Sequence, residues 1–300
     1  MIFKIFYKYR VYKSSILVSC SPGSSVILCL FFKNVIIWEN VAFFSKRRLI
    51  DQIRIKIFLA RKARIIVPTI TEKVSLVKKY STTKNIDDYI YYMPDWVNIK
   101  QNINIIRKEK HVSYPIRFIA AGSLEFRKGF DLLIHAMAKI KLLYPNKLIL
   151  DIYGEGKLRN YLQKLISDNN LNEFISLRGF DSNLYSQYIK YDGFILSSRY
   201  EGFPLVLISA LASSLPVIST DCPTGPSEII IDGVNGILTS SNSIDSLANA
   251  ISRFIDEIEY FRNIGADKAR LSATPFLIDN VLPLWRTMFI NYSNNIIKIY

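Results

Sequence analysis

The 300-residue sequence is poor in the residues that build metal sites and disulfide frameworks, with three Cys and two His. Cys20, Cys29 and Cys222 have neither a metal-ligand spacing nor the density of a disulfide scaffold, which favours a reducing compartment and therefore the cytoplasm. No Asp-x-Asp pair occurs in the sequence to hold a divalent ion. We therefore expect neither a metal ion nor any other bound cofactor.

The sequence also lacks an apolar run that could span a membrane. Its most apolar stretch, residues 16–32, is interrupted at 21–25 by Ser-Pro-Gly-Ser-Ser, whereas a spanning helix needs about 20 predominantly apolar residues. Two strands, or a strand and a helix, fit this stretch better.

Acidic residues are scarce in the first third of the chain. Residues 1–110 hold 21 Lys and Arg but 7 Asp and Glu, and residues 111–300 hold 18 of each kind. Such asymmetry favours an anionic partner, either nucleic acid or an acidic membrane surface, and a merely well-solvated basic domain is the alternative. The neutral second part and the absence of a recognition motif that interleaves aromatic and basic residues argue against nucleic acid.

A basic segment at 46–64 favours the membrane. Leu49, Ile53, Ile57 and Ala60 follow one another at helical spacing with Lys and Arg between them, as in a helix that lies at a membrane interface. A helix packed on its own sheet would show the same stripe. We expect a peripheral association with the inner face of the cell membrane, driven by anionic headgroups.

From Arg117 onward, short apolar runs alternate with amphipathic stretches, which indicates a parallel sheet wrapped by helices. The expected strands are 117–121, 148–153, 174–177, 194–197 and 216–220, and the expected helices are about 129–143, 155–169, 181–190 and 204–213. Before residue 117 the sequence predicts three strands at most, at 16–18, 34–38 and 64–68, followed by an exposed polar crossing that includes 81–95.

These patterns predict an α/β protein with two Rossmann-like, doubly wound domains. We expect a basic domain at 1–112, a second domain at 113–272, and a helical segment at 273–300 that packs back on the first domain. The few strands of the first domain predict that it is incomplete.

Residues 200–207 (Tyr-Glu-Gly-Phe-Pro-Leu-Val-Leu) follow one expected strand and open a helix. Pro204 suits the first helical turn, and the N–H groups just beyond it make an anion site. Glu201 beside them can accept hydrogen bonds from sugar hydroxyls. A well-capped core helix is the structural alternative.

Residues 121–133 form a second strand–loop–helix passage, in which Lys128 can place an ammonium against a diphosphate. Gly122 and Gly129 let the backbone approach closely there. A third loop, 153–156, holds Gly154 and Gly156. It fails the dinucleotide-binding fingerprint because Arg159 occupies the place of the last glycine, which argues against a nicotinamide oxidoreductase.

Taken together and in this order, the motifs resemble the family 4 retaining glycosyltransferases of the GT-B type, especially those that build bacterial surface polysaccharides and lipopolysaccharide. The matching runs, within about 115–272, are Gly122-Ser123-Leu124, Lys128-Gly129, Gly154 with Gly156, Glu201-Gly202-Phe203-Pro204, 216–230 and 232–236. A weaker match is Trp38-Glu39-Asn40, where the family commonly has Glu-His-Asn.

The resemblance implies that the domain at 113–272 binds a UDP-linked sugar donor and that the domain at 1–112 lies on the side of the acceptor, a growing glycan or a lipid-linked glycan. It also implies retention of anomeric configuration. It implies two catalytic residues, Lys128 on the diphosphate and Glu201 on the donor sugar, and leaves the charge of the leaving group to Lys128 and the helix terminus. The implied donor-binding set is Gly122, Ser123, Arg127, Lys128, Gly154, Gly156, Glu201, Gly202, Phe203, Pro204, Leu205 and Ser209. Glu228 is either a further donor contact or a helix cap.

Two positions depart from the family pattern. Ser123 stands where the family has a diphosphate-binding Arg, and Ser209 stands where it has a second Glu that binds ribose. Each loss removes a charge-assisted contact of roughly 1.5–3 kcal/mol, so donor affinity falls on the order of a hundred-fold unless Arg127 compensates. A decayed, non-catalytic relative that binds nucleotide or a protein partner is therefore the rival interpretation.

The resemblance finds no counterpart in residues 1–13 for the strand and glycine-rich loop with which the family's first domain opens. An incomplete sheet would have an exposed edge, and missing cleft residues would slow transfer. We therefore expect nucleotide binding to survive better than sugar transfer.

Overall fold

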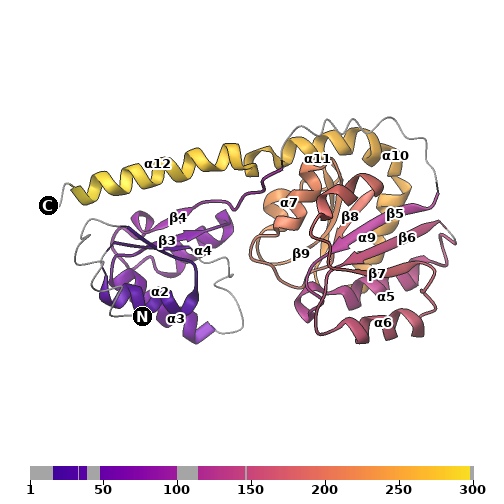
Figure 1. The fold of residues 1–300 in the computed structure, drawn as a ribbon, viewed down its shortest axis with the longest axis horizontal. Coiled ribbons are helices and arrows are strands. Elements are labelled where there is room, and N and C mark those ends of the chain that lie inside the picture. The colour runs from indigo at the N-terminus through magenta and orange to yellow at the C-terminus, as the bar shows by residue number, and fades with distance from the viewer. Residues whose placement is uncertain (1–15, 33, 39–47, 100–113, 146, 298–300) are drawn as a thin grey trace. The chain divides into compact units, whose positions relative to one another are not determined.

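The computed structural model describes residues 16–32, 34–38, 48–99, 114–145 and 147–297, without the side chains of Pro22, Gly23, Arg48 and 294–297. The chain divides into two compact units, an N-terminal unit of residues 1–95 with 279–300 and a C-terminal unit of residues 96–278 (Figure 1). The chain crosses between the units at 95–96 and 278–279, and the sequence-based domain limits at 112 and 272 stay a prediction.

The N-terminal unit contains a four-stranded parallel sheet in the order β1-β2-β3-β4. Its strands are β1 (Leu17–Ser19), β2 (Val35–Trp38), β3 (Arg64–Val67) and β4 (Ile90–Tyr92). Its helices are α2 (Pro22–Phe31), α3 (Arg48–Ala60), α4 (Ile70–Lys79), the 3-10 helix η1 (Ile86–Asp88) and, apart from its first residue, α12 (Ile278–Ile297). Because each of α2, α3 and α4 joins neighbouring parallel strands, right-handed crossovers put them on one face of the sheet.

Local sequence signals explain where these helices begin. Ser21 is the N-cap of α2 and Pro22 lies in its first turn, so the Ser-Pro-Gly-Ser-Ser interruption starts a helix. The strand-and-helix alternative for residues 16–32 is therefore confirmed. Thr69 caps α4, because its side chain accepts a hydrogen bond from the Glu72 N–H at 3.1 Å.

One expectation for the N-terminal unit is wrong. Residues 81–95, predicted to be an exposed polar crossing, contain η1 and the fourth strand β4, in which Ile90 is fully buried. Three residues are too few for a period-two pattern to stand out beside the neighbouring aspartates. The sheet therefore has four strands instead of three.

The last helix packs on the N-terminal unit through aromatic contacts. The rings of Trp38 and Trp285 lie 4.7 Å apart between centroids, and the Arg64 guanidinium lies 3.8 Å from the centre of the Tyr292 ring. Trp38 ends β2 and Arg64 begins β3, so α12 is fixed to neighbouring strands of the sheet.

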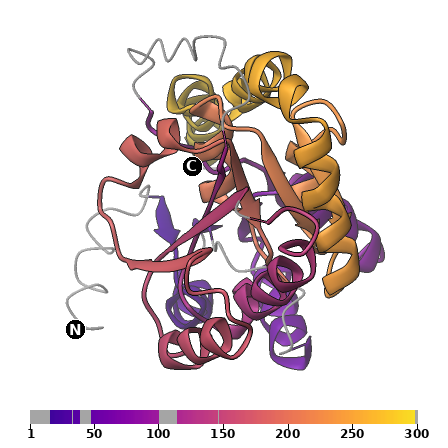
Figure 2. The same ribbon diagram turned by 90° about the vertical axis from the view of Figure 1, so that its right-hand side faces the viewer.

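The C-terminal unit contains a six-stranded parallel sheet in the order β10-β9-β8-β5-β6-β7. The strands are β5 (Ile116–Ala121), β6 (Leu148–Tyr153), β7 (Ile175–Gly179), β8 (Gly193–Leu196), β9 (Val217–Asp221) and β10 (Gly236–Ser240). The helices are η2 (Phe126–Lys128), α5 (Phe130–Ile140), α6 (Arg159–Asp168), η3 (Leu184–Lys190), α7 (Leu205–Ala212), α8 (Pro226–Ile229), α9 (Ile244–Asp256), α10 (Ile258–Tyr260), η4 (Phe261–Gly265), α11 (Ala266–Ala273) and η5 (Thr274–Phe276). Helices cover both faces of this sheet (Figure 2).

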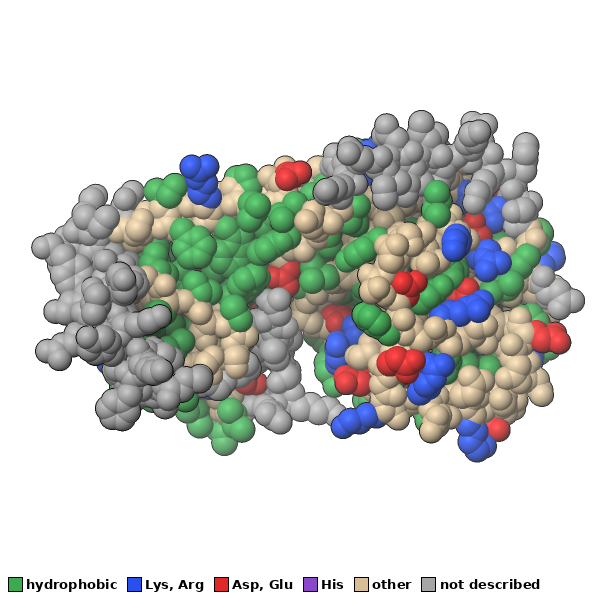
Figure 3. All heavy atoms as spheres, in the orientation of Figure 1, with side chains coloured by type: hydrophobic (Ala, Val, Ile, Leu, Met, Phe, Trp, Pro, Cys, Tyr) green, Lys and Arg blue, Asp and Glu red, His purple; other side chains and the backbone are tan. Residues whose placement is uncertain are grey.

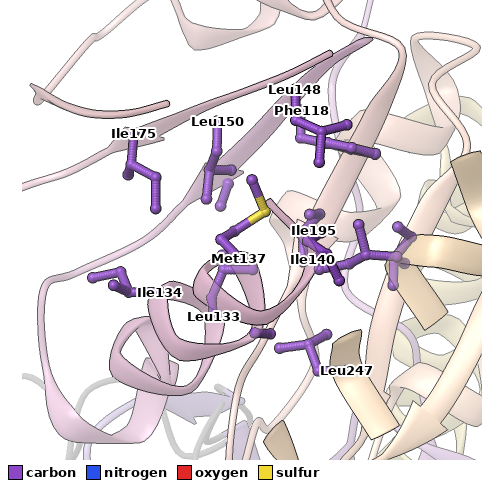
Figure 4. Packing of buried hydrophobic residues seen from close by; sticks show 14 of the residues in the cluster. Phe118, Leu133, Ile134, Met137, Ile140, Leu148, Leu150, Ile175, Ile195 and Leu247 are labelled. Carbon is purple, nitrogen blue, oxygen red and sulfur yellow. The ribbon is translucent and has the colours of Figure 1, made fainter. Parts of the chain in front are cut away.

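Each face of the sheet has its own apolar core. On one face, α5, α6 and α9 bury residues such as Met137, Ile140 and Leu247 against β5, β6 and β8 (Figure 4). On the other face, η3, α7 and α11 pack on Phe194 and Val217. The five predicted strands are confirmed to within two residues, but the sequence analysis missed the edge strand β10, and the expected helix at 181–190 is the 3-10 helix η3.

The order of strands reverses at β5. The chain runs from β5 to β6 and β7 in one direction and then returns to place β8 on the other side of β5. In open parallel sheets, ligands bind at the carboxyl ends of the strands at such a switch point. A ligand site is therefore expected at the loops that follow β5 and β8.

Candidate functional site

Two loops that the sequence singled out meet at this switch point. Lys128 ends η2 after β5, and Glu201 lies in the loop between β8 and α7. The Lys128 Nζ donates to Glu201 Oε1 at 2.5 Å, and Arg127 donates from its guanidinium to Glu201 Oε2 at 3.1 Å. Residues 73 and 74 positions apart in the sequence are thereby brought together.

The Glu201 carboxylate has a third partner, because the Ser198 hydroxyl donates to Oε1 at 2.6 Å. We call Arg127, Lys128, Ser198 and Glu201 the Glu201 cluster. Lys128 and Glu201 are 8% and 6% exposed, so the pair is largely desolvated, while the Arg127 side chain is 36% exposed. A buried ion pair gains little net stability over apolar residues, which makes an arrangement of this kind a candidate for function.

Strand β9 and the loop after it hold the backbone of the Glu201 cluster by hydrogen bonds. The Thr224 hydroxyl donates to the Glu201 carbonyl at 2.7 Å, and the Thr220 hydroxyl donates to the Ser198 carbonyl at 2.6 Å. Sequence reasoning assigned no role to Ser198, Thr220 or Thr224. The one available signal was the match of the family pattern at 216–230.

Gly129 lets the two loops touch backbone to backbone. It has a φ of +63°, and a Cβ at this position would lie 2.0 Å from the Ser197 carbonyl oxygen. In return, the Ser197 hydroxyl donates to the Lys128 carbonyl at 2.9 Å. Glycine is therefore required where Lys128 meets the start of α5.

The predicted third loop, after β6, packs against the loop after β5. A Cβ on Gly154 would lie 1.9 Å from the Gly122 carbonyl oxygen, and one on Gly156 would lie 2.6 Å from the Leu124 carbonyl oxygen. Backbone hydrogen bonds join the same loops, from Gly122 N–H to Tyr153 O at 3.0 Å and from Leu124 N–H to Glu155 O at 2.9 Å. Close packing of the two loops thus requires glycine at positions 154 and 156, whether or not a ligand binds there.

The start of α7 differs in detail from the expectation. Pro204 is the N-cap residue, one position before the first helical turn where it was predicted. The Leu205 N–H donates to the Phe203 carbonyl at 3.0 Å and the Leu207 N–H donates to the Pro204 carbonyl at 2.9 Å, so both donors are used within the turn. The Phe203 ring packs edge-on against Phe276, with centroids 5.5 Å apart, and Gly202 lies between Phe203 and the cluster in sequence.

The two serines that depart from the family pattern lie in different surroundings. The Ser123 Oγ is buried and makes no hydrogen bond within the described part of the chain. Ser209 is 1% exposed within α7, and its hydroxyl donates to the Leu205 carbonyl at 2.7 Å. Ser209 is therefore satisfied by its own helix and does not join the Glu201 cluster.

Cys222 lies near the cluster but is not a reactive thiol. Burial, followed by the negative charge of Glu201, raises the pKa of Cys222 to about 12. The thiolate is the nucleophilic form, and it is scarcely populated at neutral pH with such a pKa.

The N-terminal unit holds a buried carboxyl group that the sequence analysis missed. Asp95 is 4% exposed just after β4, and burial raises the pKa of Asp95 to about 6, against the opposing effect of a hydrogen bond with the Trp38 side chain. This group therefore changes its charge near neutral pH.

Some of the predicted features cannot be located among the described residues. Glu39, Asn40 and residues 1–13 lie outside the described residues. Within the described ranges, no three His, Cys, Asp or Glu side chains gather as metal ligands would. A metal-free site stays a prediction.

Two parallel-sheet units, with a cluster of cations and a carboxylate at the switch point of the second, define a protein of the GT-B glycosyltransferase fold. The crystal structure of HepE from Anabaena in complex with UDP has a TM-score of 0.80 to this chain at 14% identity, covering 97% of this chain and 82% of that one. The model of the family "Glycosyl transferases group 1" matches residues 101–270, and the chain belongs to this family.

Curated relatives that are similar in sequence are also glycosyltransferases. The GtfA subunit of the UDP-N-acetylglucosamine–peptide N-acetylglucosaminyltransferase of Streptococcus agalactiae is 30% identical over 226 residues, which are 73% of this chain and 43% of that protein. The N-acetylgalactosamine-N,N'-diacetylbacillosaminyl-diphospho-undecaprenol 4-alpha-N-acetylgalactosaminyltransferase of Campylobacter jejuni is 32% identical over 218 residues, 72% of this chain and 57% of that protein. The chain spans about half the length of these relatives.

Proposed function

We propose that this chain is a family 4 glycosyltransferase that moves a hexosyl or N-acetylhexosaminyl group, with retention, from a UDP-linked donor to a glycan or lipid-linked acceptor of a bacterial surface polysaccharide. The Glu201 cluster at the carboxyl ends of β5 and β8 is the observation that carries the proposal. The activities of the streptococcal and Campylobacter relatives support the class of donor and acceptor.

In this proposal Lys128 and Arg127 bind the diphosphate of the donor. Both cations already hold an anion, the Glu201 carboxylate, at 2.5 and 3.1 Å. Hydrogen bonds from charged donors to phosphate oxygens are among the strongest available in proteins. Arg127, whose side chain is partly exposed, takes the part of the Arg that the family has at the position of Ser123.

Donor binding then changes the partners of Glu201. When the diphosphate attracts Lys128 and Arg127, the carboxylate is released to accept hydrogen bonds from hydroxyls of the donor sugar. Ser198 keeps hold of Oε1 at 2.6 Å and so preserves the orientation of the carboxylate. As the bond to the sugar breaks, negative charge builds up on the leaving UDP, and the two cations stabilise it without a metal ion.

The remaining donor contacts are assigned to backbone and apolar surface. Gly122, Gly154 and Gly156 would form the floor on which the diphosphate rests, since their loops are already in backbone contact. Gly202, Phe203, Pro204 and Leu205 would contact the sugar and phosphate where α7 begins. Ser209 would face the ribose only after its hydroxyl leaves Leu205.

The test of the proposal is turnover of the purified chain with UDP-N-acetylglucosamine and UDP-N-acetylgalactosamine. We expect UDP release above the spontaneous rate, unchanged by excess EDTA, and a product of the same anomeric form as the donor when membrane extract supplies the acceptor. If the chain binds UDP but releases none from either sugar nucleotide, it is better described as a non-catalytic relative. This is the interpretation that Ser123 and Ser209, as departures from the family pattern, favour. Failure to bind UDP would reject both.

We also propose that the N-terminal unit docks on an anionic membrane. None of the helices in the described ranges has the length and apolar character needed to cross a membrane. In α3, residues Asp51, Ile55, Phe58 and Leu59 face the core. The stripe noted in the sequence is largely a different one, because Leu49 and Ile53 on it are 71% and 51% exposed, although Ile57 on the same stripe packs against the core.

The neighbouring helix α2 exposes apolar side chains as well, with Ile27, Leu30 and Phe31 between 44% and 56% exposed. Arg61, at the end of α3, donates to the Cys29 and Leu30 carbonyls and so joins the two helices. In the view of Figure 3, the hydrophobic side chains of the N-terminal unit gather mainly over α12, which is a different part of the unit from α2 and α3, and charged side chains are interspersed over the C-terminal unit. Exposed apolar groups beside basic ones are typical of a membrane-docking surface.

Replacing Leu49 and Ile53 together by Asp is expected to lower the affinity for anionic phosphatidylglycerol vesicles at least tenfold. Two exposed apolar side chains that would insert into the membrane are lost, and two negative charges that the anionic headgroups repel are added. Co-sedimentation at low and at high salt measures the effect. The matched control replaces Leu142 and Leu143 by Asp, which are 78% and 69% exposed in the C-terminal unit. Equal loss in both variants, or no salt-sensitive binding of the wild type, would contradict membrane docking.

A further inference from the structure

We propose that Arg199 is a positioning residue that holds the loop of Lys128 against the loop of Glu201 in the geometry that donor binding requires. The inference rests on the proposed function of those two residues and assigns a role to a side chain that does not itself belong to the Glu201 cluster. Arg199 lies two residues before Glu201 in the loop after β8.

All the contacts of Arg199 that define this role are made with residues 126–131, the segment that contains Lys128. Its guanidinium donates to both carboxylate oxygens of Asp131, at 2.8 and 2.6 Å, and to the Phe126 carbonyl at 2.7 Å. Its backbone N–H donates to the Arg127 carbonyl at 2.8 Å, and its guanidinium lies 3.9 Å from the centre of the Phe126 ring. We call this set of contacts the Arg199 clamp.

The clamp is sheltered from water and fully charged. The side chains of Arg199 and Asp131 are 11% and 20% exposed. Burial acts to raise the pKa of Asp131, but the hydrogen bonds and charge of Arg199, with backbone hydrogen bonds at the start of α5, outweigh it and hold the pKa below the ordinary value. The carboxylate is therefore ionised throughout the neutral range, and the two-pronged contact needs the planar fork of arginine.

The clamp is needed because donor binding breaks another link between the same loops. In the proposed function the diphosphate draws Lys128 away from Glu201, and the direct ion pair between the loops is then lost. The Arg199 clamp does not involve either residue's charged group, so it persists through this exchange. Lys128 and Glu201 thus keep their spacing while each binds a different part of the donor.

The opposite end of the same strand offers a matched control. Asp192 lies just before β8 and accepts from the Arg262 guanidinium at 3.0 Å, with side chains that are 9% and 4% exposed. This second Arg–Asp pair is more buried than the Arg199 clamp but lies at the amino end of β8, away from the loops. Loss of Arg262 should therefore lower stability without moving the donor site.

The experiment compares the full chain with Arg199→Lys, Arg199→Met and Arg262→Met by calorimetric titration with UDP and by thermal unfolding. We expect Arg199→Met to weaken UDP binding about tenfold or more, and Arg199→Lys, which keeps the charge and the fold but loses the fork, to weaken it at least threefold. Arg262→Met should lower the melting temperature as much or more and leave UDP affinity within twofold of the wild type.

The outcomes separate the inference from the function on which it rests. Wild-type binding together with unchanged affinity in both Arg199 variants overturns the positioning role alone. The same holds if Arg262→Met loses UDP affinity as much as Arg199→Met does, because the effect then follows stability. A wild-type chain that does not bind UDP overturns the proposed function and the inference with it.

Discussion

Replacing Lys128 by Ala is expected to weaken UDP binding by a factor of ten or more. Lys128 is 8% exposed, and its ammonium lies 2.5 Å from a carboxylate oxygen of Glu201. The ammonium is therefore already positioned and desolvated to bind an anion. Loss of one charge-assisted hydrogen bond costs roughly 1.5–3 kcal/mol, which corresponds to about a ten- to hundred-fold change in affinity. Calorimetric titration with UDP measures the change directly.

The matched control is Lys139→Ala. Lys139 is also a lysine of the β5–α5 region and forms an ion pair with Asp245, but both side chains are largely exposed. An exposed pair of this kind contributes little, and we expect UDP affinity and stability close to those of the wild type. Unchanged affinity in the Lys128 variant, or the same loss in both, would remove Lys128 from the diphosphate site.

The second large effect is expected from Glu201→Gln. The substitution leaves the Lys128 ammonium buried without its counter-charge, and removal of one partner of a buried pair costs about 3–5 kcal/mol. We therefore expect a marked fall in the melting temperature of the chain without ligand. Sugar transfer should fall sharply, because the amide carries no charge and offers the donor's hydroxyls one accepting oxygen instead of two.

UDP should restore part of the stability lost in this variant. The diphosphate supplies the negative charge that Lys128 and Arg127 lack, so saturating UDP should raise the melting temperature of Glu201→Gln by more than that of the wild type. Asp245→Asn, which removes the partner of the exposed Lys139, is the control and should change neither value. A smaller effect of UDP on the variant than on the wild type would show that Glu201 and the diphosphate do not share these cations.

The sequence predicted the C-terminal sheet well because its strands are buried apolar runs separated by turn residues. The runs that became β5, β6 and β8 all lie within two residues of their expected limits. The sequence placed Lys128 and Glu201 after separate strands, and ligand sites form at the carboxyl ends of parallel strands, but it did not predict the ion pair between the two side chains. The short strand β4 and the edge strand β10 were missed because their apolar patterns are too brief or too polar to stand out.

The supporting contacts of the site could not be predicted in the same way. Ser198, Thr224 and the pair Arg199–Asp131 depend on which loops touch in space, and their side chains are of types that are usually solvated on a surface. Helical spacing likewise could not distinguish the buried side of α3 from its exposed side. About half of the Lys and Arg residues of positions 1–110 lie outside the described residues. The attraction of this part of the chain to an anionic partner therefore stays a prediction from the sequence.

The most direct test of the central claim is the crystal structure of this chain with UDP bound. We expect the diphosphate at the carboxyl ends of β5 and β8, in contact with the Lys128 ammonium and the Arg127 guanidinium, with the 2.5 Å contact between Lys128 and Glu201 broken and the Arg199–Asp131 contacts intact. UDP bound elsewhere on the chain, or bound while Lys128 still holds Glu201, would contradict the account.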